Sequence, residues 1–134
     1  MYKLIKILNA RTNVPETVRM TLEEDTAVMR GTAVCIKDGI LSAFTEKSTM
    51  LPTHVVLADA NGKEILCYAV TPDMVFEIPV SVSPADMKVG TEYLLTENGS
   101  HLSATVASGS LRGAHLMNKN GASQKGDTLL VSFR

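Results

Sequence analysis

The sequence predicts an all-β fold, either a compact barrel or a sandwich, and two observations carry this prediction. Polar and apolar side chains alternate with a period of two along several segments, which is the pattern of a strand that buries one face. Turn signals separate these segments at short intervals, and no long helical pattern lies between them. The 134 residues suffice for one domain with a single hydrophobic core.

Each strand is predicted from its own pattern. Strict alternation predicts half-buried strands at residues 17–22, 75–80 and 101–106. Runs that are apolar on both faces predict strands enclosed in the core at residues 32–37, 54–58, 64–70 and 128–133. Because Pro79 cannot donate a hydrogen bond to a neighbouring strand, we expect its strand at a sheet edge, or Pro79 close to the strand's end.

The connections between the strands are also predicted. Tight hairpin turns are indicated by Asp-Gly or Asn-Gly pairs at residues 38–39, 61–62, 98–99 and 120–121. A single helical turn is expected at residues 83–90, because a serine that can cap it and a proline suited to its first position precede a glycine at its exit.

Composition and charge argue against a nucleic-acid surface. The chain has three tyrosines, three phenylalanines, no tryptophan and a net charge of −1, so it lacks the basic, aromatic-rich face that base stacking requires. Residues 1–20 and 111–134 each carry a net charge of +3, whereas residues 21–110 carry −7. Either this is scattered surface charge, or the basic ends contact an acidic surface such as a neighbouring copy.

No motif indicates catalysis, a metal or a cofactor. Cys35 and Cys67 lie in apolar runs without the spacing of a zinc site, so we expect reduced core residues, with a disulfide the less favoured alternative. The histidines are far apart, and neither the serine-nucleophile motif nor a phosphate-binding glycine motif occurs. We therefore expect no enzyme. The first apolar run is interrupted by Lys6 and Asn9, which argues against an export signal, and nothing is long enough to span a membrane.

The N-terminal residues are interpreted as an extended arm over residues 1–16, followed by a single domain over residues 17–134. Pro15 stiffens the exit of the arm and keeps Val14 extended. Two alternatives stay open for residues 3–8. They pair with a neighbouring protein, or they form the first strand of the domain's own sheet and close the barrel with the C-terminal strand, and the two can both hold in part.

The chain resembles a family of small viral proteins. The segment NARTNVPE at residues 9–16, the spacing of the β turns, and the closing Gly-Asp turn with its Val- and Phe-containing last strand are similar to those of the small head-decoration, or capsid cement, proteins of tailed phages and prophages of Gram-positive bacteria. The resemblance runs over nearly the whole chain. It implies a compact β-barrel of the β-tulip or SH3-like kind with an extended N-terminal arm.

The resemblance also implies a function that resides in surfaces. A protein of this family binds the outer surface of the virion head, after assembly in the host cytoplasm, and clips neighbouring major capsid subunits together. Homo-oligomers are expected, with a trimer favoured, and no cofactor, nucleic acid or membrane is involved. The residues expected to contact the major capsid protein are Lys3, Leu4, Ile5, Lys6, Ile7, Asn9, Arg11, Thr12, Asn13 and Pro15. The alternatives are another virion structural protein, of the tail or of head completion, and a nucleic-acid-binding barrel of the SH3-like or oligonucleotide-binding type.

Overall fold

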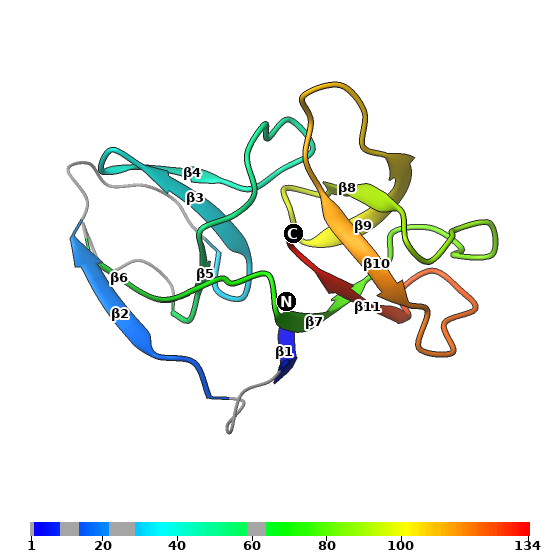
Figure 1. Ribbon diagram of the computed structural model, residues 1–134, viewed down its shortest axis with the longest axis horizontal. Coiled ribbons are helices and arrows are strands. Elements are labelled where there is room, and N and C mark those ends of the chain that lie inside the picture. Colours follow the sequence, from blue (N-terminus) through cyan, green and yellow to red (C-terminus); the bar gives the residue numbers. More distant parts are fainter. Residues whose placement is uncertain (1, 9–13, 22–28, 59–63) are drawn as a thin grey trace.

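The computed structural model describes residues 2–8, 14–21, 29–58 and 64–134 and shows two antiparallel sheets, which confirms the all-β prediction (Figure 1). In spatial order, the six-stranded sheet consists of β1 (Lys3–Ile7), β7 (Met74–Pro79), β11 (Thr128–Ser132), β10 (Ala114–Asn118), β8 (Glu92–Thr96) and β9 (His101–Val106). The five-stranded sheet consists of β2 (Thr17–Thr21), β6 (Glu64–Ala69), β5 (His54–Val56), β3 (Ala33–Lys37) and β4 (Ile40–Ala43).

The two sheets form a sandwich-like arrangement, and neither closes into a barrel among the described strands. An isolated parallel bridge between Val80 and Leu102 brings β9 close to the end of β7 without closing the six-stranded sheet. The main core receives side chains from both sheets, for example Val55 and Tyr68 from one and Ile78 from the other. A second, smaller cluster on the five-stranded sheet consists of Val34, Leu41, Val56, Ile65 and Cys67, with Met20 and Ile36 packed against it.

The aromatic side chains are all in the interior. Each of the six is at most 5% exposed, namely Tyr2, Phe44, Tyr68, Phe76, Tyr93 and Phe133. Several of their rings pack in edge-on or tilted pairs, such as Phe44 against Phe133 with 5.5 Å between centroids. Cys35 and Cys67 are free and buried, as expected, and belong to different apolar clusters.

All seven strands predicted from alternation or apolar runs are present. Strand β7 lies between β1 and β11 and is not an edge, but Pro79 is its last residue, as the alternative expectation had it. β1 pairs with β7 only as far as Glu77, so β1 needs no hydrogen from Pro79. Strands β4, β8 and β10 were not predicted from the alternation pattern. They are short. The pairing of β8 with β9 shifts register at Leu95, and the pairing of β10 with β11 shifts register at Leu116.

The predicted tight hairpin at residues 38–39 is confirmed, the pairs at residues 98–99 and 120–121 lie in the longer loops 97–100 and 119–127, and the predicted helical turn is wrong. Asp38 and Gly39 both have positive φ, at 53° and 78°, as a two-residue hairpin requires. The pair at residues 61–62 lies outside the described residues. Within residues 83–90 there is one hydrogen-bonded turn, with the Met87 N–H donating to the Pro84 carbonyl (3.1 Å), but no helix. The next amide, of Lys88, donates instead to the Tyr93 hydroxyl (2.7 Å), which stops the turn from continuing.

Candidate partner-binding surface

Five of the predicted contact residues form one edge strand of the six-stranded sheet. Strand β1 contains Lys3, Leu4, Ile5, Lys6 and Ile7, and it pairs with β7. The two lysines are exposed, whereas the three apolar side chains are half-buried. Of the two alternatives for this segment, the structure therefore has the first strand of the domain's own sheet. Its neighbour is β7 and not the C-terminal strand β11, which lies on the other side of β7.

Tyr2 anchors this strand in the main core. Its side chain is 5% exposed and its ring packs near Phe76 and Phe133, with centroids 6.3 and 6.0 Å away. Its hydroxyl donates to the Gly99 carbonyl, and its backbone N–H donates to the Gly31 carbonyl (2.7 Å). Burial raises the pKa of Tyr2 well above its usual value, because an ionised phenolate would lose its hydration there.

The remaining predicted residues fall in two groups. Asn9, Arg11, Thr12 and Asn13 lie outside the described residues, so their role and the division of the chain at residue 16 stay predictions. Pro15 is described and half-buried.

Beside Pro15 the surface has a mostly apolar groove of about 370 Å³. It lies between the segment that leads into β2 and the segment that joins β6 to β7, and it is lined by Ile7, Val14, Pro15, Glu16, Ala69, Thr71, Asp73 and Met74. The groove thus brings together two predicted contact residues, Ile7 and Pro15. At its rim Val14 is 76% exposed and adds to the apolar surface of the groove.

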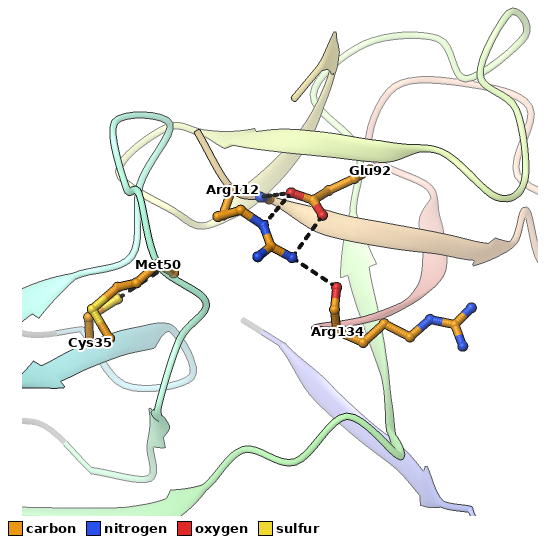
Figure 2. A network of polar contacts seen from close by, with 6 residues as sticks. Cys35, Met50, Glu92, Arg112 and Arg134 are labelled. Atoms are coloured by element: carbon orange, nitrogen blue, oxygen red, sulfur yellow. Dashed lines mark hydrogen bonds and ion pairs between the residues drawn. The ribbon is translucent and has the colours of Figure 1, made fainter. Parts of the chain in front are cut away.

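A polar network holds the chain near Arg134 against the six-stranded sheet (Figure 2). The Arg112 guanidinium donates two hydrogen bonds to the Glu92 carboxylate (3.1 and 3.3 Å) and a third to the main-chain oxygen of Arg134 (3.0 Å). The same carboxylate accepts the Gly113 N–H (2.8 Å). The Arg134 guanidinium donates to Nε2 of His115 (2.8 Å), and burial together with that positive charge lowers the pKa of His115. This network is structural, because each member is bonded to another part of the fold.

The titratable side chains do not assemble into a reactive centre in the described part of the chain. His54, His101 and His115 contact Thr53, Glu97 and Arg134, respectively, and so lie in separate places. No group of three or more His, Cys, Asp or Glu that could hold a metal ion occurs among the described residues. Those residues also include no helix long and apolar enough to cross a membrane.

Sequence reasoning overlooked an edge of the five-stranded sheet, formed by β2. Its side chains are mostly exposed, and Arg19 forms an ion pair with Glu64 of β6 at 3.0 Å. The alternation of residues 17–22 correctly indicates a strand. The position of that strand at an edge depends on long-range pairing that the local pattern does not contain.

Comparison with known proteins finds similarity in structure only. No protein-family model matches the chain, and no curated protein matches it. Among solved structures, the crystal structure of the head fiber gp8.5 N base of bacteriophage phi29 is similar, with a TM-score of 0.53 and 14% sequence identity. The alignment covers 89% of this chain and 95% of that chain. The two chains therefore share a fold over nearly their whole lengths.

Proposed function

We propose that this chain is a structural protein of a phage head, and more specifically that it decorates the outer surface of the head and clips neighbouring major capsid subunits together. The observation that carries this proposal is the shared fold with the base of a head fiber, over 89% of this chain. The resemblance of the N-terminal segment and closing strand to capsid cement proteins points to the same part of a virion.

The surface of the molecule is compatible with this role. A decorating protein needs exposed contacts on a rigid scaffold, and it needs no reactive centre. Here an edge strand, β1, carries two exposed lysines, and the groove beside Pro15 offers an apolar concavity of about 370 Å³. We propose accordingly that the protein is not an enzyme and acts as a homo-oligomer, with a trimer favoured, because several weak contacts to a repetitive shell then act together.

Two alternatives are less well supported. A nucleic-acid-binding barrel would need aromatic side chains on its surface for base stacking, but all six aromatic side chains are at most 5% exposed. A tail protein would have the same architecture, but the similar solved structure is described as part of a head fiber.

The direct test is binding of the full chain to heads assembled from the major capsid protein of the same phage or prophage. We expect the chain to co-sediment with expanded heads at a fixed ratio to the capsid subunits, and to raise the temperature at which filled heads release their DNA. Unexpanded shells and an unrelated β protein of similar size are the controls. Sedimentation no greater than that of the unrelated protein would refute head binding, and binding without a change in the release temperature would refute the clipping role.

A further inference from the structure

The four edge strands of the two sheets differ in how well they are protected against pairing with another chain. An edge strand presents unpaired N–H and C=O groups, and proteins usually blunt such edges with lysines, bulges, short strands or covering segments. Among the described strands, the edges are β1 and β9 in one sheet and β2 and β4 in the other.

Two of these edges are blunted, and the third, β4, is regular but one residue shorter than β2. β1 carries two exposed lysines and has a register shift between Leu4 and Lys6. β9 also has an irregular register, and its Leu102 carbonyl already accepts the Ser81 N–H (2.9 Å). β4 has four residues. Each of these features shortens or distorts the row of backbone groups that a new strand would need.

Among the described residues, β2 has no lysine, bulge or covering segment, and its exposed charge is Arg19. Its five residues pair with β6 in an uninterrupted register, and it contains no lysine and no proline. Within β6, the Leu66 carbonyl accepts the N–H of Leu57, the residue that follows β5 (2.8 Å). The backbone groups of Leu66 therefore point toward β5. Arg19 lies opposite Leu66, and its own backbone groups therefore point away from β6. The same alternation makes Thr17 and Thr21 present their N–H and C=O groups at this open edge.

We propose that the outer edge of β2 is a docking site for an extended segment of another protein, which adds to the five-stranded sheet as an antiparallel strand. The proposal rests on the proposed function only for the identity of that protein, which would be the major capsid protein.

The side chains of β2 define the chemistry of the incoming strand. Val18 is 39% exposed and Met20 is partly buried against the smaller apolar cluster, so aliphatic side chains opposite these two residues would extend that cluster. On the other face Arg19 is 69% exposed and pairs with Glu64. A carboxylate opposite Arg19 completes an acid–base–acid arrangement, and the fitting segment is therefore an acidic strand with alternating aliphatic residues.

A second copy of β2 fits this edge poorly. Full antiparallel overlap of two copies places Arg19 directly opposite Arg19, and like charges in that position are destabilising. If one copy of β2 is shifted by two residues along the other in one direction, Pro15 lies where a donating N–H is needed. If it is shifted in the other direction, Thr17 has no partner within β2. Self-pairing is thus disfavoured in each register.

The test uses the full chain and a peptide, acetyl-Ser-Thr-Val-Glu-Val-Thr-Ser-amide, whose residues alternate as the β2 edge requires. In a titration followed by NMR, we expect the largest amide shift changes at Thr17, Arg19 and Thr21. The same peptide with Lys in place of Glu should bind roughly threefold more weakly, and Arg19→Glu should reverse this preference. Shift changes confined to other edges, or no saturable change, would overturn the proposal.

A backbone variant separates the strand edge from the charge. Arg19→Pro removes an N–H that β6 does not use, so the fold should persist while peptide binding weakens about tenfold. Arg19→Thr keeps the N–H and removes only the charge, and it should weaken binding roughly threefold. Equal binding by the proline and threonine variants would refute strand addition. The same variants are then tested on capsid heads. If wild type and Arg19→Pro bind the heads equally well, the docking role of β2 on the head is refuted and the proposed function is not. If wild type does not bind the heads, the proposed function is refuted, and the peptide titration alone tests whether the β2 edge accepts a strand.

Discussion

Replacement of Tyr2 by alanine should destabilise the whole domain, although Tyr2 is the second residue of the chain. The side chain is 5% exposed and packs near two phenylalanine rings. An aromatic side chain of this kind buries about 200 Å², which at about 25 cal/mol per Å² corresponds to about 5 kcal/mol as an upper bound, since part of the area is polar. Truncations of large core aromatics cost about 3–5 kcal/mol. We expect the free energy of unfolding to fall by this amount and the melting temperature by roughly 10–20 °C.

The hydroxyl and the ring contribute separately, and a second variant distinguishes them. Tyr2→Phe keeps the ring but removes the donor to the Gly99 carbonyl, and it should cost about 1–3 kcal/mol because a buried acceptor loses its partner. Lys3→Ala is the matched control, since Lys3 is exposed on the same strand and its loss should change stability by less than about 0.5 kcal/mol.

Urea unfolding followed by far-UV circular dichroism measures these differences, and the m-value reports whether the unfolding unit has changed. A loss below about 1 kcal/mol for Tyr2→Ala would refute the reasoning. It would mean that residues 2–8 form an appendage that opens independently of the domain, as the arm interpretation of residues 1–16 supposes.

Two further predictions concern stability. Gly113→Ala should lower the free energy of unfolding by at least about 3 kcal/mol, because a Cβ there would lie 2.0 Å from the backbone oxygen of Tyr93. Gly90→Ala, with open space around it and φ of +93°, should lower it by about 1–2 kcal/mol. Thermal melts that show equal losses of stability for the two variants would contradict this. Burial raises the pKa of Tyr68 to about 12, so the folded state keeps a proton that the unfolded chain releases above about pH 10. Stability is therefore retained below pH 10 and should fall by up to about 1.4 kcal/mol per pH unit between pH 10 and 12. Urea unfolding at several pH values should show a shallower loss for Tyr68→Phe, and an unchanged slope would contradict the assignment.

Strands were predicted from the sequence where polar and apolar residues alternate, or where a short run is apolar on both faces. Residues 128–133 are such an apolar run and form β11, whereas in the alternating residues 101–106 Leu102 is buried but Val106 is 54% exposed. The pattern fails in β1, where Lys3 and Lys6 are both exposed although they lie three residues apart. The register shift between Leu4 and Lys6 accounts for this, because an extra residue in a strand changes which side chains face outward. A bulge depends on the partner strand and leaves no local signal.

The candidate surface was predicted in part, for a related reason. Composition and the first apolar run drew attention to the N-terminal residues, and the structure brings Ile7 and Pro15 together at one groove. The anchoring of this segment by Tyr2 was not predicted, because it depends on Gly31 and Gly99, which are far away in the sequence. Edge positions were beyond prediction as well. The two sheets interleave the chain, so that β2 pairs with β6 and β1 with β7, and only long-range pairing shows which strands have one neighbour.

The lysines of β1 illustrate how one pattern supports two functions. Exposed lysines on a first strand favour contact with an acidic partner, and they equally protect a sheet edge from unwanted pairing. The structure adds the register shift in the same strand, and a bulge beside a lysine is typical of edge protection. β2 has the opposite character, since it is regular, rich in β-branched residues and without lysine. Protection of β1 and the open edge of β2 therefore support a division in which the side chains of the N-terminal strand make surface contacts, while strand pairing takes place at β2.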